Sequence, residues 1–353
     1  MRALRWHGPR DLRLEDIVEA PLRDGELRVG VAYCGICGSD LHEYCDGPHA
    51  IPVEAPHPIS GRSAPLTLGH EFCGTVLESA MSSVREGTRV AIEPEYRCGQ
   101  CEYCRGGRYN LCRSMGFVGL MGDGGMGESA VVPGYTAHAL PDAVSFEQAA
   151  VFEPAAVALH AIRRSSLRPG DLCAVIGLGP IGLLLVALLR RCGAGRIIAV
   201  DVIGERLERA GALGADAVVN ASLEPAGPAV VRLSGGSGAD IAFEAAGSSA
   251  TLQDCLLALR KGGEAVFVGL TGEAHFDAFD FVNRELRLTS SVGYRDVYGS
   301  IIDWTARGIF DPSTIVTRIV GLEDALEGGF KALLTDRSQV KVLIDPRRSL
   351  ESA

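Results

Sequence analysis

The sequence predicts an α/β protein of two domains, one mostly β and the other a doubly wound parallel sheet. Length is the first observation, because 353 residues exceed the size at which a single hydrophobic core normally forms. The second is the stretch DLCAVIGLGPIGLLLVALLRRCGAGRIIAVDV, in which an apolar strand, a glycine turn, an apolar helix and a second strand follow one another. The third is the further alternation of strands and helices after it, which is typical of a parallel sheet.

The expected first domain covers residues 1–157. Strand-prone runs such as ELRVGVAYCG and GTRVAI lie there among Gly- and Pro-rich stretches, without regular strand–helix alternation. Residues 158–293 carry the alternation and form the second domain, and residues 294–353 return to complete the first. We expect the active cleft between the two domains, with the glycine-dense stretch GLMGDGGMGES as a loop over it.

Composition narrows the possible functions. With 47% hydrophobic and 22% charged residues, the chain is expected to be globular and not disordered. A net charge of −10, without a run of Lys or Arg, argues against nucleic acid as a partner. The N-terminal stretch MRALRWHGPRDLRLEDI lacks the apolar region of a signal peptide, and no long uncharged apolar run follows. We therefore expect no membrane association and a cytoplasmic location.

Four cysteines are crowded into the segment RCGQCEYCRGGRYNLC, namely Cys98, Cys101, Cys104 and Cys112. Their spacing lets four thiolates converge on a tetrahedral centre, and a Cys₄ zinc site has no open position, so it would be structural. Eleven cysteines cannot all pair with one another, and in a reducing compartment clustered cysteines favour metal. An iron–sulfur cluster, or thiols that are unligated or disulfide-bonded, are the alternatives.

A second group of candidate ligands predicts the reactive centre. Cys37, His70 and Glu153 offer a thiolate, an imidazole and a carboxylate, which would leave a fourth zinc position open for water or substrate. Each also has a purely structural interpretation, as a small buried residue, a core histidine or an acid at a helix N-terminus. His49 and His57, in a Pro-rich insert, are predicted to lie at the surface or cleft rim and not to bind metal.

The central stretch predicts a dinucleotide site. Its GxGxxG lies at a strand-to-helix junction, where the backbone can approach a pyrophosphate and the helix N-terminus favours negative charge. The predicted contacts in this turn are Gly177, Gly179, Pro180, Ile181 and Gly182. Asp201, nineteen residues after Gly182, ends the second strand and is expected to bind the adenosine ribose. Arg206 follows as a further candidate contact, or simply as a solvated surface charge.

Several motifs in their present order resemble the zinc-dependent medium-chain dehydrogenases over essentially the whole chain: GHE at 69–71, the four-cysteine segment, GLGPIG and FEPAAVALHA. The resemblance implies a GroES-like catalytic domain and a Rossmann domain, one catalytic and one structural zinc per chain, and NAD as cofactor. It makes Cys37, His70 and Glu153 the ligands of the catalytic zinc, with Glu71 as a nearby exchanging ligand. The pair Glu153–Pro154 resembles the polyol branch, in which a carboxylate replaces a cysteine ligand.

The resemblance also implies a proton route. Ser39 and His42, two and five residues after Cys37, match positions that relay protons through the nicotinamide ribose in the alcohol dehydrogenases. Hydrogen bonding within a local turn is the alternative for both. Asp40 is expected to orient His70 or another group beside the metal ligands.

Finer matches bear on the substrate. The insert HEYCDGPHAIPVEAPHPISGRSAPLTLGHEF and the stretches MGFVGLMGDGG and DRSQVKVLIDP are similar to 2,3-butanediol dehydrogenases, which implies a small diol or hydroxyketone as substrate. Sorbitol-type polyol and threonine dehydrogenases are the alternatives among enzymes, and a dinucleotide-binding protein without catalysis is the alternative outside them. The 45–65 insert, Tyr96, Arg97 and the GLMGDGG loop are expected to line the cleft. A homo-oligomer, dimer or tetramer, is expected from the glycine-rich region near 290–300.

Overall fold

The computed structural model describes residues 1–348. The chain divides into two compact units: unit 1 contains Met1–Glu153 and the chain from Tyr298 onward, and unit 2 contains Pro154–Val297. Both boundaries lie four residues from the positions expected from the sequence. Helix α4 (Phe152–Arg164) starts just before the first boundary, so the change of unit falls within a helix that has no break in its sequence pattern.

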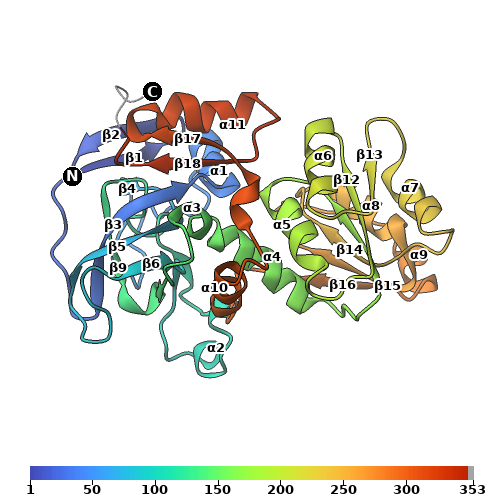
Figure 1. Ribbon diagram of the computed structural model, residues 1–353, viewed down its shortest axis with the longest axis horizontal. Coiled ribbons are helices and arrows are strands. Elements are labelled where there is room, and N and C mark those ends of the chain that lie inside the picture. Colours follow the sequence, from blue (N-terminus) through green and yellow to red (C-terminus); the bar gives the residue numbers. More distant parts are fainter. Residues whose placement is uncertain (349–353) are drawn as a thin grey trace. The chain divides into compact units, whose positions relative to one another are not determined.

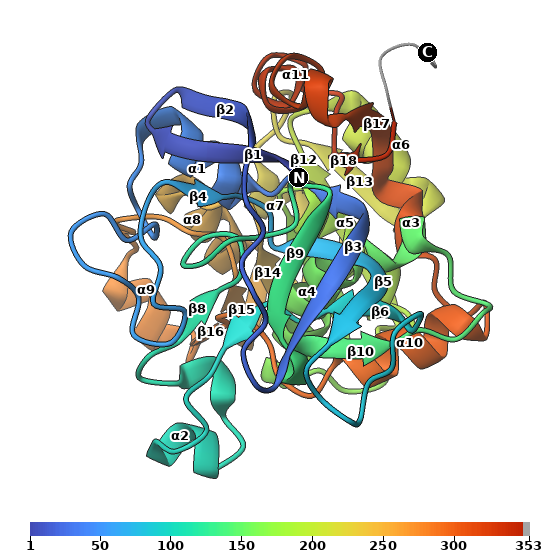
Figure 2. The same cartoon turned by 90° about the vertical axis from the view of Figure 1, so that its left-hand side faces the viewer.

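Unit 1 is built mainly from β-strands (Figure 1). Its largest sheet has seven strands in the order β10-β6-β5-β3-β18-β17, with β9 also paired to β3. These strands are β3 (Glu26–Gly35), β5 (Glu71–Ser79), β6 (Arg89–Ile92), β9 (Ser129–Pro133), β10 (Ala137–Ala139), β17 (Val316–Gly321) and β18 (Lys341–Asp345). Figure 2 shows β3, β5 and β9 side by side, as their antiparallel pairing requires.

Smaller elements complete unit 1. A three-stranded sheet has the order β2-β1-β4, and a two-stranded one joins β7 to β8. These strands are β1 (Arg2–Gly8), β2 (Asp11–Asp16), β4 (Leu66–Thr67), β7 (Glu95–Tyr96) and β8 (Gly116–Phe117). The helices are α1 (Gly38–Asp46), α2 (Glu102–Arg105), α3 (Phe146–Ala149), α10 (Tyr298–Ala306) and α11 (Ala332–Thr335), with short helical turns at Tyr109–Leu111, Gly134–Thr136, Pro312–Ile315 and Leu322–Asp324 and a π-helix at Ala325–Lys331.

The C-terminal strands position the site described below. Strand β18 pairs antiparallel with the end of β3, so that Ile344 lies opposite Cys34, and the amide of Ile36 donates to the carbonyl of Val342. This register sets the start of β18, at Lys341, beside the chain that leads from β3 into α1.

Unit 2 is a six-stranded, all-parallel sheet in the order β13-β12-β11-β14-β15-β16, with helices on both faces (Figure 1). Its strands are β11 (Leu172–Ile176), β12 (Arg196–Asp201), β13 (Ala217–Asn220), β14 (Ala239–Glu244), β15 (Leu259–Phe267) and β16 (Arg287–Ser290). Its helices besides α4 are α5 (Pro180–Leu189), α6 (Gly204–Ala212), α7 (Ala226–Leu233), α8 (Ser249–Ala258) and α9 (Ala278–Asn283). This is the strand order of a doubly wound dinucleotide-binding fold, and the predicted fold class is confirmed.

The glycine-dense stretch GLMGDGGMGES is mostly buried. Amides of residues 124–126 donate at 2.8 Å to carbonyls of residues 67–69. A side chain at Gly124 would collide with the carbonyl of Gly69, so the approach requires glycine. The stretch therefore braces the segment that ends at His70.

Within residues 1–348, no helix is both long and apolar enough to cross a bilayer.

Candidate active site and metal centres

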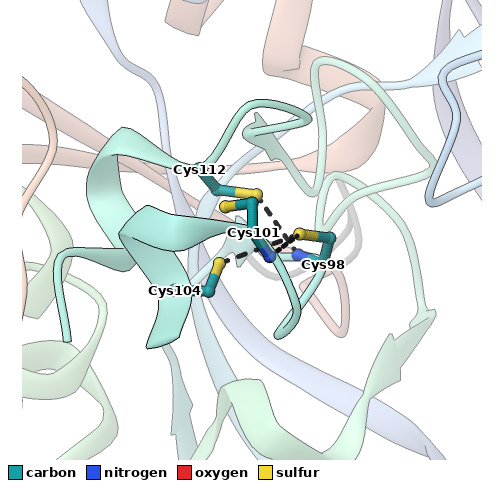
Figure 3. Close-up of side chains that lie close together, drawn as sticks. All are labelled: Cys98, Cys101, Cys104 and Cys112. Atoms are coloured by element: carbon teal, nitrogen blue, oxygen red, sulfur yellow. Dashed lines mark hydrogen bonds between the residues drawn. The ribbon is translucent and has the colours of Figure 1, made fainter. Parts of the chain in front are cut away.

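The four predicted cysteines converge in unit 1, in the loop after β7 that includes α2 (Figure 3). The Sγ atoms of Cys98, Cys101, Cys104 and Cys112 all lie within 4.8 Å of one another. The sulfurs of Cys98 and Cys104 are 3.9 Å apart. Two sulfurs of a tetrahedral site with Zn–S bonds of about 2.3 Å would be about 3.8 Å apart, so the spacing suits zinc.

The thiols of this cluster ionise unequally. Backbone N–H groups of Cys104 and Arg113 lower the pKa of Cys101 to about 6, whereas burial raises the pKa of Cys104 to about 12. Thiolates beside neutral thiols attract a soft cation, and its binding would release the remaining protons. All eleven cysteines lie within the described residues and are free thiols.

Aromatic and charged contacts anchor the four-cysteine loop. The guanidinium of Arg97 lies 4.2 Å from the ring centre of Tyr109 and 4.8 Å from that of Tyr135. The hydroxyl of Tyr109 donates to the buried carboxylate of Glu93 at 2.8 Å. The structure holds Arg97, a predicted cleft residue, on two tyrosine rings, because a planar cation stacks well on an aromatic face.

Tyr96 and His57 pack against each other. Tyr96, a predicted cleft residue, is buried, and its ring centre lies 5.6 Å from that of His57. His57, expected at the surface or cleft rim, is only 9% exposed, and burial lowers its pKa. The Pro-rich composition of the insert predicted exposure, but the insert folds back onto Tyr96.

Cys37, His70 and Glu71 form a second group of candidate ligands. Each residue places one potential ligand atom within 4.8 Å of those of the other two. Cys37 immediately precedes α1, and His70 immediately precedes β5. In the antiparallel pair of β3 and β5, Gly35 lies opposite Glu71. The strand register therefore brings the chain that enters α1 beside both residues of the GHE motif.

The carboxylate of Asp40, in the first turn of α1, lies beside the imidazole of His70. One of its carboxylate oxygens accepts from the amide of Cys37 at 2.9 Å, and the other lies 3.6 Å from Nδ1 of His70. Burial alone would lower the pKa of His70, but the charges of Asp40 and Cys37 outweigh it and raise this pKa well above its ordinary value. The hydroxyl of Ser39 lies 3.4 Å from Nε2 of the same ring. A cluster that gathers this much negative charge suits a divalent cation.

Glu71 is paired with Lys341, a residue that sequence analysis missed. The Lys341 ammonium donates to both carboxylate oxygens of Glu71, at 2.6 and 2.8 Å, and to the carbonyl of Ile36 at 2.9 Å. Lys341 is 1% exposed; burial alone would lower its pKa, but Glu71 and its neighbours raise it. The one signal in the sequence is a lone lysine that opens the apolar run KVLI, where an unpaired charge would be costly.

Glu153 lies in the first turn of α4 and is buried. It is not a member of the group that unites Cys37, His70 and Glu71, but its charge contributes to the raised pKa of Lys341. The structure therefore gathers a thiol, an imidazole and a carboxylate that a buried lysine neutralises, and a second buried carboxylate, that of Glu153, is close enough to act on the same lysine. This donor set fits zinc, which binds sulfur, nitrogen and oxygen ligands.

The glycine turn of unit 2 has the close approaches that the motif predicts. Gly177 has a φ of 92° and faces the backbone of Ala246, so a side chain there would be strained. In α5, a side chain at Gly182 would collide with the carbonyl of Gly177. Gly179 precedes α5 and has open space beside it, where a phosphate could approach the helix N-terminus.

Asp201, which is predicted to bind the adenosine ribose, has a structural role. Its carboxylate accepts from the amide of Leu178 at 2.6 Å and from the amides of Val202 and Ile203 at 2.7 and 2.9 Å. The side chain thus ties the glycine turn to the end of β12. About one of its roughly four acceptor positions is left for a ribose hydroxyl. Arg206 lies half-buried on α6.

Comparisons with known proteins agree with the fold. Residues 23–142 match the family described as alcohol dehydrogenase GroES-like domain, and residues 180–307 match zinc-binding dehydrogenase. (R,R)-butanediol dehydrogenase of Bacillus subtilis (strain 168) is 40% identical over 350 residues, which cover 98% of this chain and 100% of that protein. Sorbitol dehydrogenase of the same organism is 33% identical over 353 residues, which cover 99% of this chain and 98% of that protein.

A solved structure extends this similarity to three dimensions. The crystal structure of 2R,3R-butanediol dehydrogenase from Bacillus subtilis has a TM-score of 0.92 and 39% sequence identity to this chain, with 98% of this chain and 99% of that chain covered. The resemblance stated from the motifs is therefore confirmed. The chain belongs to the zinc-dependent alcohol dehydrogenase family of oxidoreductases.

Proposed function

We propose that the protein is an NAD-dependent dehydrogenase that interconverts (2R,3R)-butane-2,3-diol and acetoin. The observation that carries the proposal is the cluster of half-buried Cys37 with buried His70 and Glu71, with Glu153 close enough to act on Lys341, the partner of Glu71. Similarity to (R,R)-butanediol dehydrogenase over nearly the whole chain supports the substrate. Similarity to sorbitol dehydrogenase makes a larger polyol the second candidate.

Cys37, His70 and Glu153 would hold the catalytic zinc, with Glu71 in reach as a further ligand. When bound, zinc polarises the substrate oxygen and the nicotinamide accepts a hydride. Asp40 fixes the imidazole of His70 through its Nδ1 side. Lys341 neutralises Glu71, which limits the negative charge around the ligands.

The chain's own residues would also move the proton. Ser39, on the Nε2 side of His70, takes the proton of the substrate hydroxyl. His42 follows three residues later on α1 and is exposed, so it can release this proton to water. The exposed position of His42 supports this role.

A substrate panel followed by NADH absorbance tests the proposal. We expect the highest kcat/KM among oxidations with (2R,3R)-butane-2,3-diol, because buried polar groups that meet a second hydroxyl are left unpaired by a simple primary alcohol. Sorbitol and threonine are the controls. If either were oxidised at least about tenfold better, a difference of about 1.4 kcal/mol in transition-state stabilisation, the diol assignment would be wrong and the dehydrogenase assignment would remain.

The preferred nicotinamide cofactor is the next prediction. Asp201 ends β12 and keeps an acceptor position for the ribose 2′-hydroxyl, whereas its negative charge would repel the 2′-phosphate of NADP. We expect a higher kcat/KM for NAD than for NADP at saturating diol. A preference for NADP would contradict this role of Asp201.

The Cys₄ cluster is expected to hold a structural zinc, for a total of two zinc ions per chain. Cys112→Ser should leave one zinc and lower the melting temperature, because a structural zinc site contributes folding energy directly. Cys192→Ser, which changes a half-buried cysteine of unit 2, is the control and should retain both ions. Elemental analysis that finds iron in place of zinc would refute the assignment.

The free thiols also support a reducing, cytoplasmic location.

We further propose that the protein is a homo-oligomer. Strand β16 lies at the edge of the parallel sheet, and the nearby side chains of Leu288 and Val292 are exposed. A sheet edge with apolar side chains suits pairing with a second copy of the chain. Analytical ultracentrifugation of the purified protein tests this.

A further inference from the structure

A buried carboxylate lies at the carboxyl end of β14, next to the glycine turn of unit 2. Glu244 is the last residue of this strand and is fully buried, and it lies opposite Ile176, the last residue of β11. In chain order the strands run outward from β11 on one side of the sheet and from β14 on the other, and doubly wound sheets bind their ligands at this point. The position of Glu244 therefore connects it with the predicted dinucleotide site.

One oxygen of this carboxylate organises the turn that follows β14. Oε1 of Glu244 accepts from the amides of Ala246 at 2.9 Å and Gly247 at 2.8 Å. It also accepts from the hydroxyl of Thr251, in the first turn of α8, at 2.7 Å. Hydrogen bonds to a charged acceptor are stronger than those between neutral groups. The three donors therefore fix the conformation of the turn and tie it to α8.

The turn held by Glu244 packs directly on the glycine turn. A side chain at Gly177 would come within 2.7 Å of the amide nitrogen and Cβ of Ala246. On the other side, a side chain at Gly269 would come within 2.6 Å of Oε2 of Glu244. These close approaches leave no space for the turn to shift without displacing the glycine turn, so the conformation of one determines that of the other.

The stability of the fold does not account for this carboxylate. Oε2 of Glu244 has no hydrogen-bond partner within residues 1–348, and no ion pair of that part of the chain includes the residue. A buried charge without a cation costs stability, and an unsatisfied buried oxygen adds to the cost. A costly group that braces a predicted ligand site indicates a role in that site.

We propose that Glu244 is a positioning residue for the dinucleotide: its carboxylate holds residues 245–247 against the glycine turn and so keeps the cofactor site preformed. Preformed sites bind more tightly because the ligand need not order them. Glu244 would act through the turn and not through contact with the cofactor, since its side chain is fully buried. The inference rests on the proposed function as an NAD-dependent dehydrogenase.

Titration of the zinc-loaded protein with NADH, followed by cofactor fluorescence, tests the proposal. Glu244→Asp keeps the charge but is one methylene shorter, so that its carboxylate does not reach the three donors at once. We expect the Kd of NADH to rise about tenfold, as it would if the turn held its binding conformation only about a tenth of the time. KM for NAD should rise with it, whereas kcat at saturating NAD should change little, because the metal ligands are untouched.

Glu244→Gln separates the reach of the side chain from its charge. Glutamine keeps the length and an acceptor oxygen, so the Kd of NADH should rise no more than about threefold. If Glu244→Gln were impaired as much as Glu244→Asp, the charge and not the hold on the turn would matter, and the inference would be wrong.

Glu264→Asp is the matched control. Glu264 is buried on the adjacent strand β15 and accepts from the amide and hydroxyl of Ser166, but it lies opposite Ile241, near the start of β14. Its shortening should lower the melting temperature without changing the Kd of NADH. An equal loss of NADH affinity in this control, or unchanged affinity in Glu244→Asp, would overturn the inference and leave the proposed function standing. If the unaltered protein shows no saturable NADH binding, both fail.

Discussion

Replacing Cys37 with serine is expected to lower kcat/KM for diol oxidation by about a thousandfold or more. The thiol lies within 4.8 Å of ligand atoms of His70 and Glu71, and its charge helps to raise the pKa of His70. Serine stays protonated and binds zinc poorly, so the Lewis-acid contribution, worth about 4 kcal/mol or more, would be lost. Steady-state kinetics and elemental analysis of the same preparation measure the effect.

Cys45→Ser provides the matched control for this change. Cys45 lies on α1, the helix that Cys37 precedes, and is half-buried, but it does not belong to either metal-ligand group. Its replacement should change kcat/KM by no more than about twofold. The assignment of Cys37 would be contradicted by a Cys37→Ser protein that keeps its full metal content and activity, or by an equal loss in both variants.

The parts of the site that the sequence predicts are those with local signals. The four cysteines converge because their spacing lies within one loop, and the glycine turn lies between β11 and α5 because the apolar periodicity changes there. The strand order of unit 2 follows from the repeated alternation that precedes and follows this turn. Each of these features can be recognised within about thirty residues of sequence.

The missed features depend on partners that are distant in sequence. Lys341 meets Glu71 across 270 positions, and no local pattern announces the pairing. His57 is buried because it packs on Tyr96, although its surroundings are rich in Pro. Buried Glu43 accepts from the backbone amides of residues 49–51, a role that no pattern in the sequence indicates, because the conformation of this turn has no repeat. Tertiary contacts therefore determine the burial and the partners of residues that composition had assigned to the surface or had not singled out.

The pair of Lys341 and Glu71 gives the largest expected effect on stability. Lys341→Met would leave a buried carboxylate without its partner, and breaking a buried ion pair in this way typically costs about 3–5 kcal/mol. Because the folded pKa of Lys341 is raised, its contribution is fully present below its unfolded pKa of 10.5 and is lost only as pH rises through the higher folded value. The contribution of the lysine itself should therefore be constant between about pH 6 and 9, and urea unfolding at pH 7 measures the deficit.

A double-mutant cycle distinguishes an unpaired charge from a packing defect. Removing both charges, as in Lys341→Met/Glu71→Leu, should recover much of the stability that Lys341→Met loses, because no buried carboxylate is then left alone. Lys331→Met is the matched surface control, since Lys331 is paired with Glu327 on the exposed side of its helix, where solvent screens the pair and its loss should change stability little. If the double variant were no more stable than Lys341→Met, the loss would come from the shape of the lysine side chain and not from its charge. Recovery would instead identify Lys341 as the residue that makes a second carboxylate tolerable beside the zinc ligands.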